Sequence, residues 1–77
     1  MIYVDRLRRV KPTAAWRWKQ ACHLYADDIE HLHEFAQKLG LKREWFQNHR
    51  RPHYDLTAAL RFKAIKLGAV ERGRAWI

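Results

Sequence analysis

The chain has 77 residues, of which 48% are hydrophobic and 13% aromatic, a composition typical of a folded protein rather than a disordered one. This length predicts a single small domain over residues 1–77, with residues 71–77 as a peripheral tail. Sixteen Lys and Arg against eight Asp and Glu give a formal net charge of +8, which favours association with phosphate polymers or nucleotides.

The single cysteine, Cys22, excludes an intramolecular disulfide and a thiolate metal cluster, and we expect it to pack as a small apolar residue. No secretory apolar segment follows Met1, and no apolar run approaches about 18 residues. The sequence therefore predicts a cytoplasmic protein that does not use a membrane as a partner.

The first third of the chain predicts two strands separated by a basic loop. Residues 2–4 are β-branched and aromatic and predict a short strand that ends at Asp5. The basic run over residues 6–11 has no sustained period, and Trp16 and Trp18 after it predict an irregular aromatic flap. Residues 21–25 predict the second strand.

The middle of the chain predicts a helix and a third strand. Asp27, with Glu30 three residues later, is expected to cap the helix, and Gly40 supplies its stop. One apolar stripe runs along this helix, through Ile29, Leu32, Ala36 and Leu39. Residues 41–47 then predict a third short strand, and residues 50–52 a proline-containing loop.

The last third predicts a second helix that begins at Asp55 or Leu56 and runs to Leu67, followed by a short strand near Ala69–Val70. Both helices end in Lys-Leu-Gly, which suggests a repeated unit. The predicted fold class is α/β, with strand-strand-helix-strand-helix-strand order, two principal helices and a small, mostly parallel sheet. A second apolar stripe on the second helix, including Phe62, makes a homodimer a further expectation.

Polar residues follow the predicted strands, and ligands of parallel sheets bind at the carboxyl ends of the strands. We therefore expect a site at this edge. Its candidate catalytic residues are His23, His49, His53 and Asp55, and its candidate ligand-binding residues are Asp5, Asp27, Gln47, Arg50, Arg51, Tyr54, Thr57 and Arg61.

Simpler roles compete with these assignments, because Asp27 and Asp55 are also placed to cap helices. No cofactor is required by the pattern, although the histidines could join Asp5 or Asp27 in a mixed His and carboxylate site for a divalent metal. The Arg residues nearby would suit a phosphate group.

Several motifs together resemble a family of short bacterial and phage proteins known as domain of unknown function 4031. They are the Ile-Tyr-Val-Asp opening, Cys-His-Leu at residues 22–24, Leu-Gly-Leu at residues 39–41, Trp-Phe-Gln at residues 45–47 and Pro-His-Tyr-Asp-Leu-Thr at residues 52–57. The resemblance covers nearly the whole chain. It implies a compact intracellular domain and brings no activity with it.

Three functional hypotheses follow. The first is a non-enzymatic module that binds nucleic acid or a nucleotide through phosphate. The second is a minimal metal-dependent phosphodiesterase or nucleotide hydrolase that uses the same residues. The third is an adaptor or inhibitor that docks on a protein partner through the flap of Trp16 and Trp18 and the outer stripe of the second helix.

Overall fold

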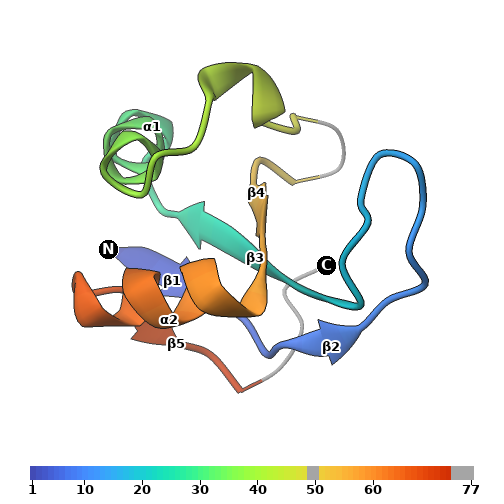
Figure 1. The fold of residues 1–77 in the computed structure, drawn as a ribbon. Coiled ribbons are helices and arrows are strands. Elements are labelled where there is room, and N and C mark those ends of the chain that lie inside the picture. The colour runs from blue at the N-terminus through green and yellow to red at the C-terminus, as the bar shows by residue number, and fades with distance from the viewer. Residues whose placement is uncertain (49–50, 74–77) are drawn as a thin grey trace.

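The computed structural model describes residues 1–48 and 51–73 (Figure 1). Its elements follow one another in the order β1 (Ile2–Val4), β2 (Arg8–Arg9), β3 (Gln20–Ala26), α1 (Ile29–Lys38), the 3-10 helix η1 (Arg43–Trp45), β4 (Tyr54–Leu56), α2 (Ala58–Lys66) and β5 (Val70–Glu71). The α/β class, the two principal helices and the strand near residue 70 are as the sequence predicts. Within the described ranges, neither helix has the length and apolar character needed to cross a membrane.

The sheet is mixed and mostly antiparallel, so the prediction of a mostly parallel sheet is wrong. Strand β3 pairs antiparallel with β1, β2 and β4, whereas β5 runs parallel to β1. The prediction assumed that each helix carries the chain back for a parallel crossover. Instead, the segment that contains η1 brings the chain back towards the carboxyl end of β3. Strand β4 starts there, with Tyr54 opposite Leu24, and runs antiparallel to β3.

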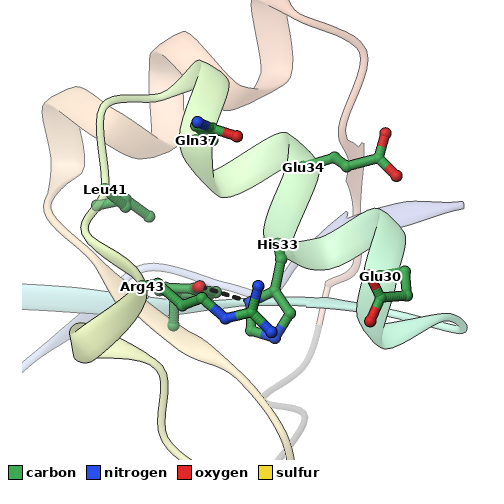
Figure 2. A pocket seen from close by; sticks show the side chains of 7 residues that line it. Glu30, His33, Glu34, Gln37, Leu41 and Arg43 are labelled. Atoms are coloured by element: carbon green, nitrogen blue, oxygen red, sulfur yellow. Dashed lines mark hydrogen bonds between the residues drawn. The ribbon is translucent and has the colours of Figure 1, made fainter.

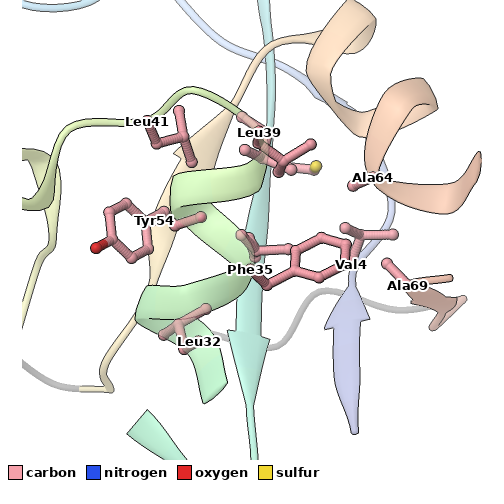
Figure 3. Packing of buried hydrophobic residues seen from close by; sticks show 12 residues of the cluster. Val4, Leu32, Phe35, Leu39, Leu41, Tyr54, Ala64 and Ala69 are labelled. Carbon is pink, nitrogen blue, oxygen red and sulfur yellow. The ribbon is translucent and has the colours of Figure 1, made fainter. Parts of the chain in front are cut away.

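The two helices pack on one face of the sheet, and the other face carries Ala21, His23 and Tyr25 of β3, which are all buried. Alternate strand residues point to the same face, and the register joins Cys22 to Leu56 and Leu24 to Tyr54. These four side chains and Val4 are nearly or fully buried, in one cluster with side chains of both helices (Figure 3). The core therefore lies between the sheet and a single helical layer.

Helix α1 follows the predicted stripe except at Ile29, which is 43% exposed. Leu32, Phe35 and Ala36 are buried on its inner side. The N-cap is Asp28, whose carboxylate accepts a hydrogen bond from the Glu30 N–H, so the predicted cap at Asp27 is displaced by one residue. Gly40 ends the helix at φ +85°, a conformation that glycine adopts without steric cost.

Helix α2 begins later than predicted, because Tyr54–Leu56 forms strand β4. Thr57 is the N-cap, and its hydroxyl accepts a hydrogen bond from the Leu60 N–H. Asp55 therefore lies in the sheet and caps no helix. Phe62, from the predicted second stripe, is 62% exposed, with the Lys66 ammonium 4.9 Å from its ring centroid.

Two loop predictions also change. Residues 41–47 form no strand but contain the 3-10 helix η1 (Arg43–Trp45), and this stretch has no β-branched residue to favour a strand. Gln47 alone forms an isolated bridge, with His53. Conversely, the basic run contains the two-residue strand β2, while the segment with Trp16 and Trp18 is an irregular loop, as predicted.

Candidate metal centre

The polar face of the sheet gathers histidine and aspartate from three segments of the chain. Alternation along β3 sends His23 to this face, between two residues directed to the core. Asp55 of β4 lies opposite His23 in the register, and the Asp5 N–H donates to the His23 carbonyl at 3.2 Å. Strand pairing therefore brings together residues that are 18 and 32 positions from His23 in the sequence.

Asp5 holds the His23 ring in one tautomer. The Asp5 carboxylate is fully buried; its Oδ1 accepts from the His23 backbone N–H at 2.6 Å, and its Oδ2 lies 2.5 Å from Nδ1. A carboxylate accepts hydrogen bonds, so Nδ1 carries the ring proton and Nε2 keeps its lone pair. The aspartate–histidine arrangement is the one that commonly orients histidine ligands of metals.

His53 has the same tautomer for a different reason. Its Nδ1 lies 2.6 Å from the Arg51 carbonyl oxygen, which can only accept, so Nδ1–H is again the donor. Its Nε2 lies 3.6 Å from Asp55 Oδ1, and its ring meets the His23 ring edge to face at a centroid separation of 4.9 Å. In both buried imidazoles Nδ1 is thus the donor and Nε2 carries the lone pair; Nε2 of His23 has an Arg8 nitrogen at 3.2 Å, and Nε2 of His53 has the Asp55 carboxylate at 3.6 Å.

Asp55 completes the group. The Gln47 side-chain amide donates to Asp55 Oδ2, and the other carboxylate oxygen faces His53. In the described part of the chain, His23, His53 and Asp55 each offer one ligand atom, and these atoms lie within 4.8 Å of one another. Donors around a tetrahedral zinc are about 3.4 Å apart, so binding an ion would draw them together by at most about 1.4 Å.

Arg8 is a neighbour that the sequence reasoning missed. Its two terminal nitrogens lie 3.3 Å and 3.2 Å from Nδ1 and Nε2 of His23. Arginine only donates and Nδ1 already carries a proton, so the contact at Nε2 is the one that can be a hydrogen bond from the guanidinium. Arg8 forms no ion pair with a carboxylate among the described residues. The sequence signal that could have identified Arg8 is its position in the basic run directly after Asp5.

The structure gives other predicted ligand residues supporting roles. Arg61 donates from Nε to the Asp5 carbonyl at 2.9 Å and pairs with Glu71, so it positions the Asp5 backbone. Arg51 supplies the carbonyl that orients His53. Thr57 is occupied as the cap of α2.

Three further predicted residues lie away from the centre or outside the described part. Asp27 is at the far end of β1, where it accepts from the Tyr3 hydroxyl at 3.1 Å. Tyr54 points to the helical side and its hydroxyl lies 2.8 Å from His33 Nδ1. His49 and Arg50 lie outside the described residues.

Cys22 is next to His23 in sequence but belongs to the core. Burial, together with the nearby Asp5 carboxylate, raises the pKa of its thiol to about 12. The thiol is therefore protonated at neutral pH and does not act as a thiolate ligand or nucleophile. This agrees with the apolar role predicted from the sequence.

A separate hollow of about 300 Å³ lies on the helical side (Figure 2). Its walls are the outer face of α1, with Glu30, His33 and Glu34, and Arg43 of η1, while Tyr54 contributes to its lining. None of His23, His53 or Asp55 lines it. The hollow and the polar group therefore lie on opposite sides of the sheet.

Fold and site together define a small α/β protein with a buried His and carboxylate group on the face of a mixed sheet that is opposite the helices. Residues 2–76 match the family model described as "Protein of unknown function (DUF4031)", and the chain belongs to this family. No curated protein and no solved structure matches the chain. The resemblance noted from the sequence motifs is thereby confirmed.

Proposed function

We propose that the protein is a metal-dependent phosphoester hydrolase whose ion is held by His23, His53 and Asp55. The observation that carries the proposal is that these two buried imidazoles and one carboxylate offer ligand atoms within 4.8 Å of one another. Each Nδ1 is engaged by an acceptor, so Nε2 is the nitrogen that a metal would use, and at His23 the ion would replace the Arg8 contact. Two nitrogens and one carboxylate oxygen are a donor set used by catalytic zinc, which keeps a further position open for water.

The charge of the chain favours an anionic substrate. The net charge is +8, and the Arg8 guanidinium lies beside the proposed centre without a carboxylate of its own among the described residues. Arginine suits phosphate because its planar fork matches two phosphate oxygens. A phosphate ester bound next to Arg8 would lie near the proposed metal position.

The reaction would be hydrolysis of a phosphodiester. A water oxygen adds to phosphorus and the P–O bond to the leaving group breaks. The leaving oxygen takes one proton of the water, and the new phosphate monoester releases the other to solvent at neutral pH. A divalent ion held by His23, His53 and Asp55 would supply Lewis acidity for this step and would activate the water.

The test starts with metal-free protein titrated with Zn²⁺, Mn²⁺ and Mg²⁺, followed by assays with bis(p-nitrophenyl) phosphate. We expect Zn²⁺ or Mn²⁺ to bind at one site and to support hydrolysis that is lost in His53→Gln. His31→Ala is the matched control, because His31 is an exposed histidine of α1. Failure to bind any of the three ions, or equal effects of both variants, would reject the proposal.

The second candidate is a non-enzymatic module that binds a phosphate-bearing ligand. It is favoured by the contact between Arg8 and His23, which places a guanidinium beside the polar group. Salt-sensitive nucleotide binding without turnover under every metal condition would support this module over the hydrolase. Loss of that binding in Arg8→Ala would then assign it to this site.

A further inference from the structure

The antiparallel segment that contains β2 and the start of β3, residues 6–20, is strongly basic. We call it the basic hairpin. It carries six cations and no Asp or Glu, and its cationic residues are Arg6, Arg8, Arg9, Lys11, Arg17 and Lys19. Within the described residues, none of the six forms an ion pair. Six unpaired cations on one short segment create a positive field that attracts phosphate.

The basic hairpin is an ordered platform. Arg8 and Arg9 pair with the start of β3, and the Val10 N–H extends this ladder to the Lys19 carbonyl at 2.9 Å. At the tip, the Thr13 N–H donates to the Trp16 carbonyl at 2.7 Å. Figure 1 shows the loop of this hairpin standing away from α1 and α2. Its backbone is therefore ordered by pairing, and its loop lies outside the core.

Two indoles lie on this platform. Trp16 is anchored by its Nε1–H, which donates to the Gln20 carbonyl at 3.3 Å. Its ring meets the Trp18 ring at a centroid separation of 4.9 Å and an interplanar angle of 61°. Trp18 is 45% exposed, and the Arg17 guanidinium lies 5.5 Å from its ring centroid. Exposed aromatic rings among cations form the stacking surface that single-stranded nucleic acids use.

The basic hairpin leads directly to the proposed metal centre. Arg8 of β2 contacts His23, and Gln20, which holds Trp16, is three residues before His23 on the same strand. At about 3.3 Å per residue, this separation is about 10 Å. A short oligonucleotide could therefore stack on the indoles and place a phosphate near His23.

We infer that the basic hairpin binds single-stranded nucleic acid and, resting on the proposed hydrolase function, delivers its phosphodiester backbone to the centre. A single strand fits better than a duplex, because its unpaired bases are free to stack on indoles. Stacking also argues for nucleic acid over an anionic membrane surface, which offers charge but no aromatic faces.

The experiment measures fluorescence anisotropy of a labelled oligothymidylate of about ten nucleotides, with EDTA present so that binding is read without turnover. We expect Trp18→Ala to weaken binding about 5- to 150-fold, the loss expected for one stacked base. Trp45→Ala is the matched control, because Trp45 is 51% exposed with the Lys42 ammonium 5.6 Å from its ring centroid, but lies in η1. It should bind as the wild type does.

The salt dependence provides a second measurement. For a single strand, each cation that contacts phosphate contributes about 0.7 to the slope of log affinity against log salt. The double variant Arg17→Ala with Lys19→Ala should therefore reduce the slope by about 1.4. Equal weakening by Trp18→Ala and Trp45→Ala, or an unchanged slope, would overturn the assignment.

Two comparisons separate this inference from its competitors. Tighter binding to a duplex of the same length, or Trp18-dependent binding to anionic vesicles with no oligonucleotide binding, would also overturn it. Oligonucleotide binding in EDTA, with no metal binding in the titration described above, would retain the inference and reject the hydrolase. Metal binding with hydrolysis of the small ester, but no oligonucleotide binding, would retain the hydrolase and reject the inference about the basic hairpin.

Discussion

Replacing Asp5 with asparagine tests the tautomer that supports the metal centre. Asparagine keeps the shape and can still accept the His23 backbone N–H through its oxygen. Its NH₂ group would then face His23 Nδ1, where the carboxylate oxygen now lies at 2.5 Å. Because an NH₂ group donates, Nδ1 would become the acceptor and the proton would move to Nε2. The nitrogen proposed to bind metal would lose its lone pair.

The expected effects follow from the hydrogen bonds that the buried carboxylate makes with His23. Loss of an outer partner of a ligating histidine typically lowers metal affinity 10- to 100-fold. Replacing hydrogen bonds to a charged group with neutral ones should cost about 1–3 kcal/mol in the free energy of unfolding. A domain of this length is expected to be stable by about 4–12 kcal/mol, so Asp5→Asn should remain folded.

The assays are calorimetric titration with Zn²⁺ and nitrogen-15 NMR of the imidazole rings, which reports the protonated nitrogen. Asp27→Asn is the matched control, because Asp27 is an exposed carboxylate at the far end of β1 that accepts from the Tyr3 hydroxyl. Its zinc affinity should equal that of the wild type. Unchanged affinity in Asp5→Asn, with the proton still on Nδ1 of His23, would refute the reasoning.

Two further predictions concern the core. The pKa of the Cys22 thiol is raised from 9.0 to about 12, so the stability it contributes is present below about pH 9 and is lost as the pH rises towards 12. Denaturant unfolding of metal-free protein between pH 9 and 11 should show a steeper loss for the wild type than for Cys22→Ala, and parallel curves would contradict this. Leu24→Ala, at a fully buried position, should cost about 2–5 kcal/mol, whereas Phe62→Ala should stay within about 0.5 kcal/mol. Equal losses of stability for these two variants in thermal unfolding would contradict the prediction, because the exposed Phe62 ring would then stabilise the fold as much as Leu24 does.

The sequence by itself determined the local features of this protein. The strand around His23, the stripe of α1 and the glycine that ends it follow from hydrophobic period and backbone preference, which act over a few neighbouring residues. The inert role of Cys22 follows in the same way from its apolar neighbours. Most members of the polar group were also identifiable, because histidine and aspartate stand out next to apolar strands.

Only the tertiary structure decided how these elements meet. Strand β4 has three residues, too few to outweigh the helix-start pattern of Asp55 and Thr57, so its existence depends on pairing with β3. The direction of that pairing turned a mostly parallel prediction into a mostly antiparallel sheet. It also placed His23 and Asp55 side by side on one face of the sheet, and not at its carboxyl edge.

The same pairing selected which polar residues can act together. Asp55 joined His23 and His53, while Asp27 stayed at the far end of β1 and Tyr54 turned to the helical side. Arg8 came to lie on His23 through β2, a strand of two residues with no sequence pattern of its own. Local preference acts between near neighbours, whereas contacts between distant segments depend on the energy of packing the whole chain, which no single stretch of sequence contains.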